Sequence, residues 1–270
     1  MAILGFSMRF SVLGSGSRGN SVFLESGKTG ILIDAGFSGK EILTRLQSIG
    51  RELQDVHALF LTHEHNDHIY GAGVLSRKAK IPAYATSGTL DAGALRMGEL
   101  FARREFVSGD LITINDLTVR SFRVSHDTAD PVGFIVSDGQ SSVGYCTDTG
   151  KVSHLMLQRL KGCEALILEF NHNLEMLKNG PYPLPLQQRV RSSVGHLSNE
   201  DAAEFLAELM NPHLRVVVLA HLSETNNTPI LAREAARLVL PPSDEPALFI
   251  AEQARALPLL EIPTNGIATY

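Results

Sequence analysis

Residues 62–68 of the chain are Thr-His-Glu-His-Asn-Asp-His, which places three histidines and one aspartate in a single short segment. Imidazole nitrogens and carboxylate oxygens are ligands for zinc, manganese and iron in proteins. Because side chains of an extended chain repeat every two residues, His63 and His65 project to the same side and can bind one metal together. We expect the chain to turn into a helix at Asp67 and His68, which then face a second position. The segment predicts a metal site; the alternative is a solvated loop that is rich in histidine.

Residues of metal-binding type also follow predicted strands elsewhere in the chain. Short apolar runs with β-branched residues predict strands at Arg9–Leu13, Ser21–Glu25, Ile31–Ile33, Ala58–Thr62, Thr118–Val124, Val132–Ser137, Val143–Thr147, Ala165–Leu168 and Val216–Ala220. The residues that come just after six of these runs are Asp34, His63, His126, Asp148, Glu169 and His221. Functional side chains often lie on loops held by a rigid scaffold, so we expect one site at one edge of a β-structure. Polar residues that merely end strands would explain one or two of the six.

Two capping patterns predict helices between the strands. Ser38 opens a helix at Glu41–Ile49 and Ser198 opens another at Ala202–Met210, because each serine has an acidic residue three positions later. The segment Gly180–Pro185 predicts an irregular loop, since its prolines cannot donate hydrogen bonds to a sheet. Runs of strands with interspersed helices indicate an α/β (α+β) fold, in which two mixed sheets pack together with helices outside.

The composition is that of an ordinary soluble globular protein. The 270 residues are 44% hydrophobic and 20% charged, so we expect a single domain over residues 1–270 with a substantial core. No segment reaches the roughly 18 apolar residues of a membrane span, so no contact with a membrane is expected. The only cysteines are Cys146 and Cys163, which favours a cytoplasmic protein over a disulfide-bonded secreted one. The net charge of −5 argues against a broadly basic surface, so any contact with nucleic acid would be local, at the mouth of the site.

The pattern His-x-His-x-Asp-His at residues 63–68 resembles the signature of the metallo-β-lactamase superfamily. Further motifs of that superfamily follow in the same order along the chain: Ile33–Gly36, Ser125–His126, Thr147–Gly150 and Ala220–His221. The resemblance spans nearly the whole chain. It implies the four-layer αββα sandwich of the metallo-β-lactamase fold, built from two sheets with helices on both outer faces.

The resemblance also implies two divalent metal ions, zinc or manganese, with iron also compatible with the ligand set. Carried over by motif, the first metal takes His63, His65 and His126, the second takes Asp67, His68 and His221, and Asp148 bridges the two. Asp34 would orient one of the ligand histidines through a hydrogen bond. Two cations about 3.5–4 Å apart hold a bridging water and lower its pKa, so that hydroxide is available near neutral pH.

Departures from the β-lactamases themselves favour the nuclease branches of the superfamily. Metallo-β-lactamases typically have a cysteine ligand where this chain has Asp148, and we expect nearby Cys146 to be a small buried residue instead. The sequence Gly-His-Leu-Ser around His196 resembles a segment of ribonuclease Z, and Glu169 matches the glutamate that partners its histidine. This resemblance implies that Asp67, Glu169 and His196 form a proton relay. His196 would then protonate the leaving oxygen or contact the scissile phosphate.

The lengths of chain between the motifs distinguish among the nuclease families of the superfamily. Ribonuclease Z carries a tRNA-binding arm between its third and fourth motifs, and β-CASP nucleases carry a large domain before the last histidine; this chain has room for neither. The chain more closely resembles the YycJ (WalJ) family of bacterial proteins, through Leu13–Ser21, Glu169–Asn173, Glu175–Pro183, Gly195–Asn199 and His221–Asn227. This resemblance implies a single-domain phosphodiesterase that acts on DNA, with 5′-to-3′ exonuclease activity as the expected form.

Other interpretations use the same residues. A small-molecule hydrolase of thioesters or lactones, like the glyoxalase II-type enzymes, would have the same ligands, and Glu169 with His196 is what favours phosphodiester chemistry. An inactive binding protein is disfavoured by the complete ligand set. The Gly14–Asn20 loop is equally consistent with a phosphate-binding loop and a tight turn, and His172 with a site residue and a structural one. The sequence leaves open the native metal, DNA against RNA, the cleavage polarity and the oligomeric state.

Overall fold

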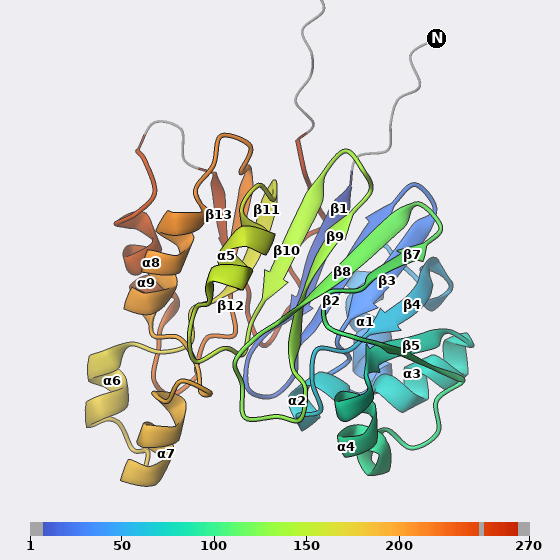
Figure 1. Ribbon diagram of the computed structural model, residues 1–270, viewed down its shortest axis with the longest axis horizontal. Helices are drawn as coiled ribbons and strands as arrows, with labels where there is room; N and C mark the ends of the chain where they lie inside the picture. The colour runs from blue at the N-terminus through green and yellow to red at the C-terminus, as the bar shows by residue number, and fades with distance from the viewer. Residues whose placement is uncertain (1–7, 243–245, 264–270) are drawn as a thin grey trace, which may run out of the picture.

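Two seven-stranded sheets face each other in the part of the chain, residues 8–242 and 246–263, that the computed structural model describes (Figure 1). The outer ends of the expected domain, residues 1–7 and 264–270, lie outside the described residues. One sheet has the strand order β14-β1-β2-β3-β4-β5-β6 and the other has the order β13-β12-β11-β10-β9-β8-β7. Apart from β14, each sheet is therefore built from one half of the chain.

The strands of the two sheets have the following bounds. The first sheet contains β1 (Arg9–Gly14), β2 (Ser21–Ser26), β3 (Thr29–Ile33), β4 (Val56–Phe60), β5 (Pro82–Thr86), β6 (Ala102–Phe106) and β14 (Leu260–Glu261). The second contains β7 (Leu111–Ile114), β8 (Leu117–Arg123), β9 (Val132–Ser137), β10 (Ser142–Cys146), β11 (Ala165–Glu169), β12 (Val216–Ala220) and β13 (Ala247–Ile250). Both sheets mix parallel and antiparallel pairs, as expected from the sequence.

Helices cover the outer face of each sheet and complete four layers. The helices of the first half are α1 (Gly39–Ser48), α2 (Asn66–Ile69), α3 (Ala72–Ala79) and α4 (Ser87–Met97), with a 3-10 turn at Leu53–Asp55. Those of the second half are α5 (His154–Leu160), α6 (Leu174–Asn179), α7 (Leu184–Val190), α8 (Asn199–Leu209) and α9 (Pro229–Arg237). Among the described residues, no helix is long and apolar enough to cross a membrane.

Three apolar clusters explain why the layers stack in this order. On β3, Ile31 and Ile33 belong to the cluster between the sheets, whereas Leu32 belongs to the cluster under the helices of the first half. On β12, Val218 likewise faces the other sheet, and Leu219 packs in the cluster that includes α5, α8 and α9. Each central strand is thus apolar on both faces, which requires cover on both sides. The αββα architecture predicted from the resemblance is confirmed. The single domain stays a prediction, which the continuous core between the sheets supports.

The serine caps are where the sequence placed them, but both helices start earlier than expected, and α1 begins at Gly39 rather than at Glu41. Ser38 Oγ accepts a hydrogen bond from Glu41 N at 3.2 Å, and Ser198 Oγ accepts one from Asp201 N at 3.0 Å. Because the cap residue directly precedes the first helical residue, α8 begins at Asn199 rather than at Ala202.

The prediction of an irregular loop over Gly180–Pro185 was wrong for its last two residues. Helix α7 begins at Leu184, with Pro183 as its N-cap and Pro185 in its first turn. Proline is tolerated there because the first-turn N–H groups have no partner within the helix. Only residues 180–183 are irregular.

Candidate metal centre

The site lies at the carboxyl ends of neighbouring parallel strands. Strands β3 and β4 are parallel, as are β10, β11 and β12, so the loops that leave them emerge at one edge of each sheet. Asp34 and His221 directly follow β3 and β12, and Asp148 comes two residues after the end of β10; all three have left-handed backbone angles, with φ of 60°, 55° and 57° for Asp34, His221 and Asp148. Residues with a Cβ adopt this region rarely, at a cost of order 1–3 kcal/mol. The fold accepts strain at three residues of the same cluster.

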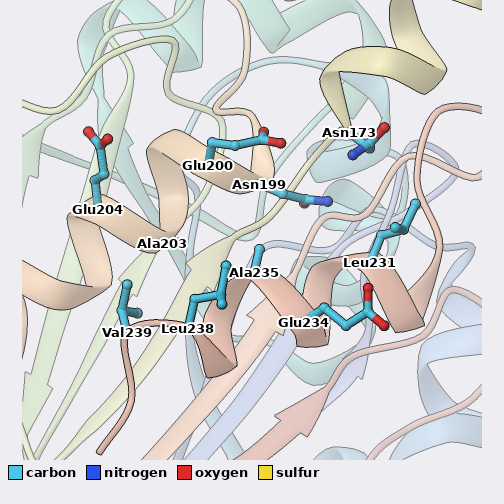
Figure 2. A pocket seen from close by; sticks show the side chains of 10 residues that line it. All are labelled: Asn173, Asn199, Glu200, Ala203, Glu204, Leu231, Glu234, Ala235, Leu238 and Val239. Atoms are coloured by element: carbon cyan, nitrogen blue, oxygen red, sulfur yellow. The ribbon is translucent and has the colours of Figure 1, made fainter.

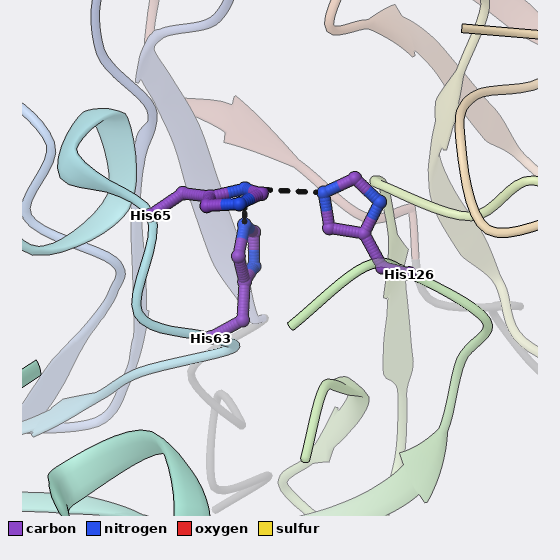
Figure 3. Close-up of side chains that lie close together, drawn as sticks. All are labelled: His63, His65 and His126. Atoms are coloured by element: carbon purple, nitrogen blue, oxygen red, sulfur yellow. Dashed lines mark hydrogen bonds between the residues drawn. The ribbon is translucent and has the colours of Figure 1, made fainter. Parts of the chain in front are cut away.

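Three histidine nitrogens converge at the first position. Nε2 of His63 and Nε2 of His126 each lie 3.2 Å from Nδ1 of His65 (Figure 3). Nitrogens bound tetrahedrally to one metal at about 2.0–2.1 Å would lie about 3.3 Å apart, so the observed spacing fits a shared cation. His63 and His65 follow β4, and His126 follows β8, so the first position joins the two sheets.

Asp67, His68 and His221 gather beside the first group. Nε2 of His68 and Nε2 of His221 lie 3.5 and 3.7 Å from Oδ2 of Asp67. Oδ2 of Asp148 is 3.4 Å from His68 Nε2, and its Oδ1 is 3.9 Å from His126 Nε2. The Asp148 carboxylate therefore lies between the two groups, where the resemblance expects a bridging ligand.

Buried atoms without partners support a cation at this position. His221 Nε2 and Asp148 Oδ2 are both buried and lack a hydrogen-bond partner. Buried polar atoms in proteins nearly always have one, so each exception needs an explanation. Both atoms belong to groups of side chains whose ligand atoms lie within 4.8 Å of one another. The cluster thus has the composition and the geometry of a divalent metal site.

Hydrogen bonds to the far side of two rings fix which nitrogen faces the centre. His68 Nδ1 is 2.8 Å from Asp34 Oδ2, and His126 Nδ1 is 3.1 Å from the Gly195 carbonyl oxygen. An acceptor at Nδ1 holds the proton there and leaves Nε2 free to bind a metal. Asp34 also accepts from Thr62 N at 2.9 Å, which fixes the carboxylate itself. This hydrogen bond to His68 is the contact that an orienting role for Asp34 requires, and the role itself stays a prediction.

The two groups of histidines differ in charge. Burial, together with repulsion from neighbouring histidines, lowers the pKa of His63 well below its usual range and that of His65 to about 4. Burial alone would also lower the pKa of His68 and His221. Asp148 and the neighbouring carboxylates outweigh it, raising the pKa of His68 well above its usual range and that of His221 to about 10. The imidazoles of the first group are therefore neutral and can bind a cation directly. The protonated imidazoles of the second group balance the negative charge of the carboxylates, a role that a bound cation would take over.

Glu169 connects His196 to His221. Its Oε1 lies 2.7 Å from His196 Nδ1 and 3.0 Å from His221 Nδ1, while its Oε2 accepts from the backbone N–H groups of Leu197 and Thr149. Burial would raise the pKa of this carboxyl, but the two imidazoles hold it well below its usual range, so Glu169 is ionised. The Glu169–His196 pair of the expected relay is therefore in contact. Asp67 lies on the opposite side of His221, near Nε2.

An open cavity of about 370 Å³ gives access to the cluster. It is lined by Ser17, His65, Asn66, Asp67, Arg96, Asp148, Arg189, His196 and His221. No sequence pattern indicated Arg96 in this wall, because α4 lies far from the motifs along the chain. Arg189, in the same wall, binds Asp127 Oδ2 through its Nε at 2.6 Å. Asp127 in turn lies 3.6 Å from His126 Nε2, so it belongs to the site although no motif indicated it.

A larger cavity of about 670 Å³ lies elsewhere, between α8 and α9 (Figure 2). Its walls combine Ala203, Leu231 and Leu238 with glutamates such as Glu200 and Glu234, and they include none of the clustered ligand residues. The chemistry is therefore concentrated in the smaller cavity.

Two other residues considered from the sequence are buried beside the site. Cys146 is 1% exposed in the apolar cluster under α5 and α8, and burial raises the pKa of its thiol well above the usual range. It is the small buried residue that the sequence suggested. His172 is 1% exposed, pairs with Ser198 in an isolated β-bridge, and has an Nδ1 without a partner. It is not among the side chains that line the open cavity.

Comparison with known proteins agrees with this fold and this site. Residues 29–222 match the family model described as "Beta-lactamase superfamily domain", so the chain belongs to that superfamily. It is 40% identical over 235 residues to exodeoxyribonuclease YycJ of Bacillus anthracis, covering 86% of this chain and 89% of the relative. It is 39% identical over 236 residues to exodeoxyribonuclease WalJ of Streptococcus pneumoniae, covering 86% and 87%. Within the superfamily, it is thus a member of the YycJ and WalJ family.

Among solved structures, the fold resembles the metallo-β-lactamase fold protein YhfI of Bacillus subtilis. The TM-score is 0.73 at 17% identity, and the alignment covers 93% of this chain and 99% of that one. At this identity the likeness concerns the fold alone. It agrees with the four layers described above.

Proposed function

We propose that the protein is a metal-dependent nuclease that hydrolyses phosphodiester bonds in DNA. The observation that carries the proposal is one open cavity lined by four residues of the ligand cluster, by two arginines and by His196, which is bonded to the buried Glu169 behind it. Relatives that share about 40% of its residues are named exodeoxyribonucleases, which supports DNA as the substrate and exonucleolytic cleavage as the reaction. A nuclease of this kind would act in the cytoplasm, where the two unpaired cysteines are also expected to persist as thiols.

The ligand cluster would hold two divalent ions, zinc or manganese. The first would be bound by the three nitrogens of His63, His65 and His126, and the second by Asp67, His68 and His221, with Asp148 shared between them. When bound, such ions activate a water molecule and stabilise the charge that develops on phosphate oxygens.

The protein's own side chains would supply the remaining steps. Glu169 holds the Nδ1 proton of His196, which leaves His196 Nε2 to face the substrate. The negative charge of Glu169 offsets positive charge on that ring, so His196 can deliver a proton to the leaving oxygen, as general acid catalysis requires.

Arg96 and Arg189 would hold the phosphates of the DNA strand. Both line the cavity and both are exposed side chains whose guanidinium groups match phosphate geometry. Because the protein carries a net charge of −5, these local cations provide attraction that the surface as a whole does not.

The test is degradation of double-stranded DNA labelled at the 5′ or the 3′ end, by purified protein with added manganese. His65→Ala is the control, because it removes one nitrogen of the first position and leaves both arginines in place. We expect cleavage that requires His65, with release from the 5′ end first. Absence of cleavage of DNA and RNA under zinc and manganese would instead favour the hydrolysis of thioesters or lactones by the same centre.

A further inference from the structure

The loop between β1 and β2 contacts all three residues of the second ligand group. In this loop, Asn20 Nδ2 lies 3.2 Å from Asp67 Oδ2 and 3.1 Å from His68 Nε2. Ser15 Oγ accepts a hydrogen bond from the backbone N–H of His221 at 2.9 Å. The same hydroxyl donates to Asn20 Oδ1 at 2.9 Å. Two side chains of one loop thus join residues that follow β4 and β12, in different sheets.

The partners of Asn20 determine which way its amide group points. The backbone N–H of Gly16 can only donate, and it lies 2.9 Å from Asn20 Oδ1. The Gly16 carbonyl can only accept, and it lies 3.0 Å from Nδ2. The NH2 group therefore faces Asp67 and His68. Because Ser15 Oγ already accepts from His221 N–H, its single proton is available for Asn20 Oδ1.

Both side chains are buried, and the backbone of Asn20 itself is held by bonds that do not involve its side chain. Asn20 is 1% exposed and Ser15 is 4% exposed. Asn20 N donates to the Asp67 carbonyl at 2.8 Å, and Gly36 N donates to the Asn20 carbonyl at 2.9 Å. Removal of the Asn20 side chain would leave these backbone bonds in place. The side chain thus bonds both to Gly16 within its own loop and to the Asp67 carboxylate outside it.

His221 depends on these contacts more than an ordinary loop residue does. Its backbone is left-handed, so it needs partners on both polar groups to stay in this conformation. Ser15 binds its N–H, and Asn171 Nδ2 donates to its carbonyl at 2.9 Å. Loss of the Ser15 hydroxyl would leave a buried N–H without an acceptor at the residue that carries a metal-binding nitrogen.

We propose that Ser15 and Asn20 are positioning residues for the second metal ion. Asn20 holds the Asp67 carboxylate by donation to Oδ2, and Ser15 holds the strained backbone of His221. The inference rests on the proposed two-metal function and assigns Ser15 and Asn20 of the Gly14–Asn20 loop to assembling the metal centre. It predicts that the second ion depends on this loop and that the first, bound by His63, His65 and His126, does not.

The test is titration of the metal-free protein with Co²⁺, followed by its visible absorption and by calorimetry. We expect the native chain to bind two ions, and Asn20→Ala to bind the first unchanged and the second about 10–100-fold more weakly. Ser15→Ala should weaken the second ion in the same way, and Ser15→Thr should restore it because the hydroxyl returns. The matched control is Asn211→Ala, which removes an asparagine bonded to two backbone carbonyls after α8, at the opposite ends of the strands.

Two results would overturn the inference while leaving the two-metal function intact. One is Asn20→Ala protein that binds both ions with native affinity. The other is loss of both ions together with a lower melting temperature, which would make the loop a general structural support. A native chain that binds fewer than two Co²⁺ ions would overturn the proposed metal centre itself, and that result is visible without any variant.

Discussion

Replacement of Glu169 by glutamine removes one charge and one acceptor from the centre of the site. Four donors converge on this carboxylate: the Nδ1 atoms of His196 and His221 at 2.7 and 3.0 Å, and the backbone N–H groups of Leu197 and Thr149 at 3.1 and 3.2 Å. Glutamine has the same shape but only one oxygen. Its NH2 group must therefore face one pair of donors.

Either orientation of the new amide is unfavourable. If the NH2 faces the backbone groups, two buried donors lose their acceptor, at about 1–3 kcal/mol each. If it faces the imidazoles, the protons of both rings move to Nε2, which in His221 is the nitrogen that we propose binds the metal. We expect turnover to fall by about 10²–10⁴, because His196 loses the partner that makes it an acid. The second metal should bind about 10–100-fold more weakly.

The assay is DNA cleavage under single-turnover conditions, with metal content measured on the same preparations. Glu208→Gln provides the control, since it removes an equal charge from an exposed position on α8. Glu169→Gln protein with native turnover and two bound ions would refute the role given to this carboxylate. A loss of turnover that saturating metal fully restores would refute the proton-transfer role and leave only the metal-orienting one.

Further predictions concern the acid, the ionisation state and the substrate. His196→Ala should keep both metal ions while turnover falls by about 10²–10⁴; loss of metal, measured by atomic emission, would make His196 a ligand instead. Because the pKa of His221 is raised to about 10 in the metal-free protein, binding of the second ion releases protons, so its affinity should increase as pH rises. Calorimetry in buffers of different ionisation enthalpy measures this release, and equal heats in all buffers would contradict it. Arg189→Ala should weaken DNA binding and reduce the salt dependence of the binding constant by about one unit of slope; an unchanged slope would mean that Arg189 serves only Asp127.

Strands with a strong local pattern of apolar residues were predictable from the sequence. Strands that form mainly because they pair with an adjacent strand were not. The nine predicted strands all occur, within two residues at each end. Strand β6 was missed because Arg103, Arg104 and Glu105 are exposed in it, and it needs only β5 beside it at the edge of the sheet. Strand β13 was missed at an edge of the second sheet, where it pairs with β12 alone, and β5, β7 and β14 were also missed. An edge strand carries little alternation of its own, because only part of its surface is buried.

The sequence by itself determined the kinds of ligand atom and their order along the chain. Three histidines and an aspartate within seven residues specify metal chemistry because no other common use needs that density of imidazole, and local spacing already puts His63 and His65 on one side. Strand after strand then ends in a further ligand-type residue. These are local properties of the covalent chain, so they can be recognised without knowing how the sheets pack.

Only the tertiary structure decided which groups act on which. Glu169 binds both His196 and His221, and Ser15 and Asn20 reach across the sheets to the second ligand group. These contacts join residues separated by up to 206 positions in the chain. Their geometry depends on the stacking of two sheets and on left-handed turns at strand ends. No local pattern encodes such distances, because hydrogen bonding requires atoms to meet within a few tenths of an ångström, and packing alone supplies that precision.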